Sequence, residues 1–361
     1  MTCKNKSFGA LFNSKMMHSR LFIIAVITVV LWLAISSCRK DVPVPIPKST
    51  HLPQVPGYFP EQHYDNPLNP ITIEGVELGR KLFYDKTLSK TGEISCASCH
   101  KQSAAFSDPG KALSTGIKGR TGLRNSPALF NLAWHPGFNW DGGINHIEVQ
   151  PIAPIQDSAE MGEKLLNVVL KIGARSDYQE SFKKVFDTDT VTDKYILYAF
   201  AQFMSAMISA DAKYDRVQQN KAVFTESEKR GLQLFEAQCA SCHKPPLFSD
   251  FSYRNNGIEI QNEDYGRYGI TSIEADKGKF KVPSLRNINL TPPYMHDGRF
   301  ENLDEVLNHY TTNERYAPDA DTDLPQNLEL SKAQKADLKA FLGTLTDYNF
   351  IENPLFSDPR Q

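Results

Sequence analysis

Two copies of one motif carry the residue types best suited to chemistry in this chain: Cys96-Ala-Ser-Cys99-His100 and Cys239-Ala-Ser-Cys242-His243. In Cys-x-x-Cys-His, both thiols can form thioethers with the vinyl groups of a haem while the adjacent imidazole binds the iron. A zinc site is a weaker explanation because no further cysteine pair completes it, and a dithiol or disulfide pair leaves both histidines without a role. We therefore predict two covalently bound c-type haems, with His100 and His243 as iron ligands.

Each motif follows a similar phrase, Leu-Gly-Arg-Lys-Leu-Phe at 78–83 and Gly-Leu-Gln-Leu-Phe at 231–235. The repeat indicates a duplicated helix that packs over each haem. We expect a mainly α fold of two cytochrome c-like haem domains with long loops. Their predicted bounds are 71–220 for an N-terminal haem domain and 221–350 for a C-terminal haem domain, followed by a tail at 351–361.

Helical signals position these domains between long loops at 101–160 and 244–300. Apolar residues at 165–172 follow helix spacing, and the segment 194–212 is long, apolar and free of Gly and Pro. Thr225 with Glu228 and Ser331 with Gln334 have the spacing of capping boxes that open helices. Loops of this length are unusual in a compact domain unless a large group, such as a haem, organises them.

The N-terminus has the features of an export signal. Basic residues precede the apolar stretch 21–35, which is short for a membrane span and ends just before Ser36-Ser37-Cys38. We expect residues 1–38 to be a lipoprotein signal peptide that ends at a lipidated Cys38. An uncleaved membrane anchor is the alternative. Six prolines between 41 and 60 predict an extended tether over 39–70. Both interpretations place the protein in the periplasm, attached to a bacterial membrane. If Cys38 is lipidated, we expect the lipid to be the only contact with the membrane.

Composition excludes one class of function. The chain has 361 residues, a net charge of −2 and 23% charged residues, with no long run of Lys or Arg. Nucleic-acid binding normally needs a basic patch, so we expect no nucleic-acid partner.

The chain resembles the bacterial di-haem cytochrome c peroxidases and their relative MauG. The resemblance covers roughly residues 78–310, and its phrases are LGRKLFYDKTLSKTGEISCASCHKQSAAFSD, GLRNSPALFNLAW, NWDGGINHIEVQPIAPIQDSAEMG and FKVPSLRNINLTPPYMHDGRFENLDEVLNHY. It implies an N-terminal haem that reacts with H2O2 and a C-terminal haem that receives electrons from a small cytochrome c or cupredoxin. The alternative is a MauG-like oxidase that uses H2O2 to oxidise a protein or organic substrate at a distance. A homodimer is compatible with either function.

The resemblance assigns Glu160 and Gln150 to the peroxide side of the first haem, with Glu160 as acid/base. From its sequence position alone, Glu160 is better explained as a surface residue that opens a helix at Met161, and the resemblance reverses that preference. Family members that need reductive activation carry a ligating histidine seven residues before the arginine at 124. Ile117 stands at that position here and cannot bind iron, so we expect an open site in the oxidised enzyme, with His135 as the nearest alternative ligand.

The second haem needs a sixth ligand, and Met295, His309 and Tyr310 are candidates. Tyr310 shares a helix stripe with Leu303, Val306 and Leu307, which turns His309 aside. The resemblance places the sixth ligand at Tyr310, where MauG has tyrosine and the peroxidases have methionine. Met295 stays the alternative because thioether ligation is common in c-type cytochromes.

The resemblance further implies an electron relay and a metal ion between the domains. Trp140 matches the tryptophan that lies between the haems, whereas Trp134 is better explained as a core residue. A calcium ion is implied at Asn125, Thr291 and Pro293, where oxygen ligands would suit it. His296 is expected to order the second haem.

Overall fold

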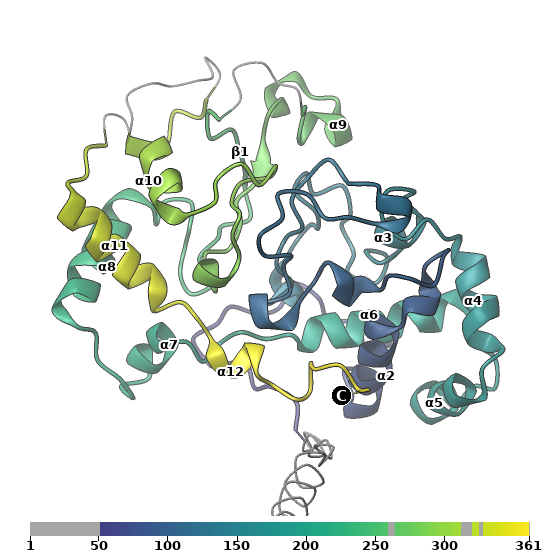
Figure 1. Ribbon diagram of the computed structural model, residues 1–361. Coiled ribbons are helices and arrows are strands. Elements are labelled where there is room, and N and C mark those ends of the chain that lie inside the picture. The colour runs from purple at the N-terminus through teal and green to yellow at the C-terminus, as the bar shows by residue number, and fades with distance from the viewer. Residues whose placement is uncertain (1–50, 259–263, 312–319, 325–327, 361) are drawn as a thin grey trace, which may run out of the picture. The chain divides into compact units, whose positions relative to one another are not determined.

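The computed structural model describes residues 51–258, 264–311, 320–324 and 328–360 (Figure 1). The expected signal peptide, Cys38 and the start of the tether lie outside these residues. The fold is mainly α-helical, as predicted, with a two-stranded antiparallel sheet. The helices are α2 (Ile73–Tyr84), α3 (Ile152–Gln156), α4 (Leu165–Gly173), α5 (Ser176–Phe186), α6 (Asp193–Ala206), α7 (Lys213–Gln218), α8 (Glu226–Gln238), α9 (Tyr268–Thr271), α10 (Leu303–Thr311), α11 (Lys332–Gly343) and α12 (Tyr348–Ile351). The strands are β1 (Tyr253–Arg254) and β2 (Phe280–Lys281).

The repeated sequence phrase corresponds to a repeated helix crossing. Helix α2 packs on α6, and α8 packs on α11. Gly79 lies so close to α6 that a Cβ there would be 2.1 Å from the Ala199 carbonyl oxygen. At the equivalent position in α8, a Cβ on Gly231 would be 2.0 Å from the Asp337 carbonyl oxygen. Only glycine permits this approach, so each Cys-x-x-Cys-His motif follows a helix held tightly against a partner.

The described residues belong to one compact unit that contains two large hydrophobic cores. The first core is built around α2 and α6, and the second around α8 and α11. The end of the chain returns to the first core, where Phe350 and Phe356 are buried, and Figure 1 shows the C-terminus beside α2. The segment that we expected to be a tail is therefore packed into the N-terminal half of the protein.

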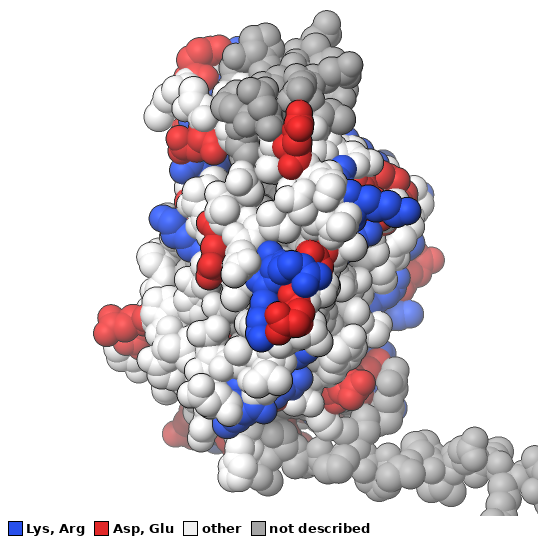
Figure 2. Space-filling model, turned by 90° about the vertical axis from the view of Figure 1, so that its left-hand side faces the viewer, with Lys and Arg blue, Asp and Glu red and all other residues white. Residues whose placement is uncertain are grey.

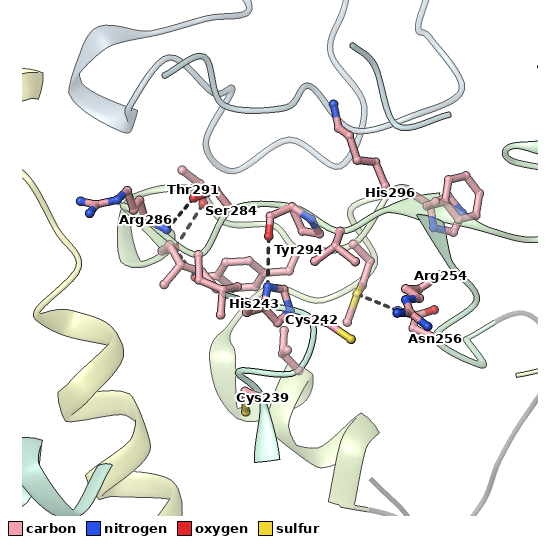
Figure 3. A pocket seen from close by; sticks show the side chains of 18 of the residues that line it. Cys239, Cys242, His243, Arg254, Asn256, Ser284, Arg286, Thr291, Tyr294 and His296 are labelled. Atoms are coloured by element: carbon pink, nitrogen blue, oxygen red, sulfur yellow. Dashed lines mark hydrogen bonds between the residues drawn. The ribbon is translucent and has the colours of Figure 1, made fainter. Parts of the chain in front are cut away.

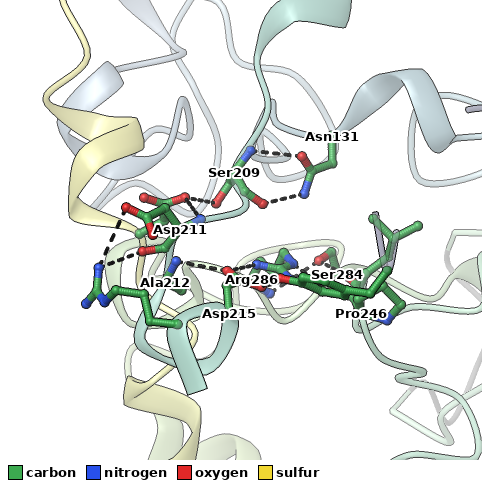
Figure 4. A network of polar contacts seen from close by, with 12 residues as sticks. Asn131, Ser209, Asp211, Ala212, Asp215, Pro246, Ser284 and Arg286 are labelled. Carbon is green, nitrogen blue, oxygen red and sulfur yellow. Dashed lines mark hydrogen bonds and ion pairs between the residues drawn. The ribbon is translucent and has the colours of Figure 1, made fainter. Parts of the chain in front are cut away.

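The helices that the sequence predicts are present in the structure, with one difference. Both predicted capping boxes are present, and the periodic segment 165–172 is helix α4. The apolar segment predicted as helix over 194–212 stops being helical at Ala206. Side chains replace the helical hydrogen bonds beyond that point: the Ser209 N–H donates to Asn131 Oδ1, and the Asp211 N–H donates to Asp347 Oδ2 (Figure 4). These partners are distant in sequence, so the helix end could not be read from local propensity.

Part of the segment predicted as a free tether is packed on the body. Phe59 is 8% exposed and contacts Trp134 edge-to-face at 5.4 Å between ring centroids. The Trp134 indole donates to the Pro60 carbonyl, which confirms Trp134 as a core residue. Tyr58 donates to Asp215, whose carboxylate forms a fully buried ion pair with Arg286. Aromatic anchors between the prolines therefore fix this segment.

In the part of the chain that the structure covers, no helix is long and apolar enough to cross a membrane.

Candidate functional site

The N-terminal motif forms a single tight turn. Cys96–Ser98 is a 3-10 helix, and the backbone N–H groups of Cys99 and His100 both donate to the Cys96 carbonyl. His100 Nδ1 lies 2.7 Å from the Phe106 carbonyl oxygen. A carbonyl only accepts, so Nδ1 carries the proton and Nε2 is the nitrogen with a lone pair for iron. Burial lowers the pKa of His100, which keeps the ring in the neutral form that binds metal.

The C-terminal motif repeats this arrangement at the end of α8 (Figure 3). The His243 N–H donates to the Cys239 carbonyl, and His243 Nδ1 is 3.1 Å from the Pro283 carbonyl oxygen. Its Nε2 is again the nitrogen suited to iron. Burial raises the pKa of both Cys96 and Cys239 to about 12, so they remain neutral thiols. All four motif cysteines are free of disulfide bonds.

A cavity of about 330 Å³ opens beside the second motif. Its walls are mostly apolar and include Cys239, Cys242 and His243. The predicted stripe of α10, including Leu303, Leu307 and Tyr310, also lines it, which confirms the predicted face of that helix. Protein interiors rarely contain voids of this size, and this volume is typical of ligand sites. The two thiols, the oriented imidazole and the apolar walls together fit a covalently attached haem.

Tyr310 and Met295 both reach the second site and share one polar neighbour. The Asn256 amide donates to Met295 Sδ at 3.4 Å and is hydrogen-bonded to the Tyr310 hydroxyl. His309 Nε2 instead donates to the Asn256 carbonyl, and His309 is not among the residues that line the cavity. Asn256 had no sequence signal, since it is one of two adjacent asparagines in a loop. The structure brings both candidate sixth ligands to the site, and the choice of Tyr310 stays a prediction.

Glu160 lies beside Ile117 and near the first motif. The Ile117 N–H donates to the Glu160 carbonyl, and Ile117 is buried at 4% exposure. The Glu160 charge acts on both Cys96 and Cys99. Although more than a third of the Glu160 surface is accessible, surrounding protein raises its pKa to about 7, with a smaller contribution from Asp157. A carboxyl group with this pKa can both take and give a proton near neutral pH.

Trp140 lies where the two halves of the chain meet. Its indole donates to the Asn125 carbonyl at 2.8 Å, and its own carbonyl accepts from the Lys281 N–H at 2.7 Å.

Gln150 lines the cavity beside the second motif, and so do Asn125, Thr291 and Pro293. The Asn125 amide nitrogen donates to the Lys111 and Ala112 carbonyls, which leaves its Oδ1 as an oxygen for a cation.

His135 also lines this cavity, but its surroundings are apolar. Its ring lies 4.5 Å from that of Phe251, and its Nδ1 is buried without a hydrogen-bond partner. Burial and the charge of Lys281 lower the pKa of His135 well below its usual range. His296, the other histidine singled out, stacks on Phe280 at 3.8 Å and lines the cavity near the second motif.

Known proteins are similar to most of this chain. Residues 73–223 match the family model described as di-haem cytochrome c peroxidase. The methylamine utilization protein MauG of Methylorubrum extorquens is 34% identical over 282 residues, which cover 77% of this chain and 79% of that protein. Cytochrome c551 peroxidase of Nitrosomonas europaea is 35% identical over 289 residues, covering 78% of this chain and 83% of that protein. The crystal structure of a MauG-like protein associated with microbial copper homeostasis superposes with a TM-score of 0.79 at 32% identity, covering 85% of this chain and 99% of that chain.

Proposed function

The chain belongs to the family of di-haem cytochrome c peroxidases and MauG, and from this premise we propose that it reduces H2O2 to water with electrons from a small cytochrome c or cupredoxin. Members of this family carry two c-type haems. We assign one to Cys96, Cys99 and His100 and the other to Cys239, Cys242 and His243, in an N-terminal and a C-terminal haem domain. When bound, the haems supply an iron that binds peroxide and two centres that hold the oxidising equivalents.

The protein supplies the proton transfer and the electron route. Glu160, in its carboxylate form, takes a proton from the incoming peroxide and returns it to the leaving oxygen. From the family resemblance we assign Gln150 the role of orienting the peroxide by hydrogen bonding; in the structure its side chain lines the cavity beside the second motif. Trp140 contacts both halves of the chain through its indole and its carbonyl, and we assign it the relay of electrons toward the first site. Two electrons and two protons convert each H2O2 into two waters.

The observation that carries this proposal is the pair of Cys-x-x-Cys-His turns, in each of which the imidazole Nδ1 is bonded to a backbone carbonyl so that Nε2 is left for iron. One turn lies beside an apolar cavity, and the other lies near Glu160. Stopped-flow oxidation of a reduced small cytochrome c or cupredoxin by H2O2, with and without the enzyme, tests the proposal. We expect two donor molecules oxidised per peroxide. Absence of enzyme-dependent donor oxidation with both classes of donor would contradict the peroxidase function.

A MauG-like oxidase is the second candidate, and the ligand arrangement favours it. Tyr310 stands at the second site, and Ile117 replaces a ligating histidine. In this function the donor is replaced by a protein or organic substrate that is oxidised at a distance from the peroxide site. The same stopped-flow experiment separates the two, because such an oxidase would react with H2O2 without rapid turnover of the small redox protein.

Haem content gives the first test of the site assignment. We expect the mature protein to carry two haems per chain. Cys239→Ala should leave one haem joined through a single thioether, which shifts its pyridine haemochrome band, while the N-terminal haem keeps its normal band. Cys96→Ala is the matched control and should move the effect to the other haem. One haem per chain in the wild type would refute the assignment.

Peroxide reactivity of the resting enzyme follows from Ile117. An open coordination site needs no ligand to leave first, so the fully oxidised protein should react with H2O2 without prior reduction. Stopped-flow spectra of the oxidised protein mixed with H2O2 measure this directly. A reaction that occurs only after partial reduction, with wholly six-coordinate low-spin EPR signals at rest, would point instead to His135 as a ligand.

We also propose a calcium ion held by Asn125 Oδ1 and the carbonyls of Thr291 and Pro293. Oxygen donors of this kind suit calcium. Removal of the ion with EGTA is expected to lower the melting temperature, and added Ca²⁺ should restore it more effectively than Mg²⁺, which demands stricter octahedral geometry. An EGTA-treated protein with unchanged melting would contradict the site.

Export and attachment through Cys38 complete the proposal. The apolar signal segment and the small residues before Cys38, which resemble a bacterial lipoprotein cleavage site, support a periplasmic enzyme held to a bacterial membrane by lipid. Metabolic labelling with a radioactive fatty acid, compared between the wild type and Cys38→Ala, tests this attachment.

A further inference from the structure

Lys281 occupies a central position that no function discussed so far uses. It ends strand β2 and lines the cavity beside the second motif. Its Nζ donates to the Gly137 carbonyl at 2.6 Å, and its backbone N–H donates to the Trp140 carbonyl. The ammonium group is therefore held between the second site and the segment that contains Trp140.

The charge of Lys281 is not compensated by the described part of the protein. Arg254, Lys281 and Arg286 are the lysines and arginines that line the cavity. Arg254 pairs with Asp323, and Arg286 pairs with Asp215. Among the described residues, Lys281 has no ion pair.

The acid whose charge acts on Lys281 does not neutralise it either. Asp141 acts on Lys281 through its charge, but its carboxylate is bonded to Arg124. Burial dominates, and the pKa of Lys281 falls to about 7. Together with burial, the charge of Lys281 also lowers the pKa of His135, which lines the same cavity. A partly buried cation that no described residue pairs is costly, so a group that brings a negative charge into the cavity would be bound favourably.

We propose that Lys281 is a carboxylate-binding residue, and that the carboxylate it binds is a propionate of the haem held by Cys239, Cys242 and His243. This proposal rests on the haem assignment of the preceding section. A haem attached at these cysteines brings two carboxylates to a cavity whose two arginines are already paired. Among the described residues that line the cavity, Lys281 is the lysine or arginine that remains to receive one of them.

This pairing has a consequence for electron transfer. An ammonium group near the haem disfavours ferric iron, which carries one more positive charge than ferrous iron. Lys281 therefore raises the reduction potential of the C-terminal haem relative to the N-terminal haem. Because its backbone also bonds Trp140, the same residue sets both the position of the relay and the driving force across it.

Lys281→Gln tests the proposal, since glutamine keeps a donor for the Gly137 carbonyl but removes the charge. Equilibrium redox titration of the holoprotein, in buffer free of carboxylates and peroxide, resolves the two haems by their optical spectra. We expect the ferric-to-ferrous equilibrium of the C-terminal haem to shift about tenfold toward ferric, which is the scale of one unit charge in a partly buried site. This shift corresponds to a reduction potential that is lower by about 59 mV. Lys281→Arg should restore the wild-type potential.

Lys279→Gln is the matched control. Lys279 lies two residues away, does not line the cavity and has no ion pair among the described residues. Its substitution should leave both potentials unchanged. An unchanged C-terminal potential in Lys281→Gln, or an equal shift of both haems, would overturn the proposal, because a merely structural lysine predicts no effect specific to one haem.

The source of the carboxylate is tested with added formate. A propionate that already occupies Lys281 leaves the wild-type potential independent of formate. A potential that depends on formate in the wild type but not in Lys281→Gln would show that a free carboxylate binds there, which overturns the propionate assignment. Failure of the haem assignment is a separate result, because it appears as fewer than two haems in the pyridine haemochrome assay.

Discussion

Glu160→Gln should slow the reaction of the oxidised protein with H2O2 by about 10²-fold or more, the scale of losing a positioned general acid/base. Glutamine keeps the shape of the side chain and cannot transfer the proton. Both haems and their resting spectra should be retained, because Glu160 is assigned no ligand role. Pre-steady-state mixing with H2O2 measures the effect. Glu93→Gln is the matched control: this exposed residue lies shortly before the N-terminal motif, and its substitution should leave the rate unchanged.

The pH dependence gives an independent check on the same residue. The proton acceptor must be deprotonated, and the pKa of Glu160 is about 7, so the wild-type rate should rise with pH through that value and then level off. Asp157 raises the pKa of Glu160 through its charge, so Asp157→Asn should move this rise to lower pH. A Glu160→Gln variant with the wild-type rate and pH profile would reduce Glu160 to a structural residue.

Tyr310→Met should raise the reduction potential of the C-terminal haem. Phenolate is an anionic donor that stabilises ferric iron, whereas a neutral thioether favours ferrous iron. Redox titration of the variant beside the wild type measures the shift. Tyr294→Phe is a useful control, since Tyr294 lines the same cavity and its hydroxyl donates to the Ile288 carbonyl. That variant should leave the potential unchanged.

The same variant separates the two candidate functions. A cytochrome c peroxidase would retain much of its turnover with Met at position 310, whereas a MauG-like oxidase would lose substrate oxidation. If Met295 is the ligand instead, Tyr310→Met should leave the potential unshifted and Met295→Leu should lower it. The similar-volume Tyr310→Met swap would then cost a packing penalty of about 1.5 kcal/mol or less, unless the Asn256 contact is left unpaired.

Much of the architecture was predictable because its signals are local. The capping boxes at Thr225 and Ser331 and the stripe through Tyr310 depend on residues within one or two helical turns. The end of α6 did not follow from such signals. Asn131 and Asp347 supply hydrogen bonds at 207–211 from opposite parts of the chain, and these bonds outweigh a helix-favouring composition.

The packed N-terminal segment shows the same limit. Proline density indicates an extended backbone, but it says nothing about where that backbone lies. Phe59 and Tyr58 fix it through Trp134 and Asp215, neither of which is near it in sequence. The return of Phe350 and Phe356 to the first core is likewise a long-range packing result.

The sequence alone determined the cofactor-binding chemistry, because Cys-x-x-Cys-His brings two thiols and an imidazole together within five consecutive residues. Through its family phrases it also indicated Glu160 and Tyr310. Only the tertiary structure decided the electrostatics of the site: the raised pKa of Glu160, the contact of Asn256 with Tyr310 and Met295, and the charge of Lys281, which no described residue pairs. Burial and charge pairing depend on which distant segments surround a group. A linear order of residues does not contain that information until the chain has folded.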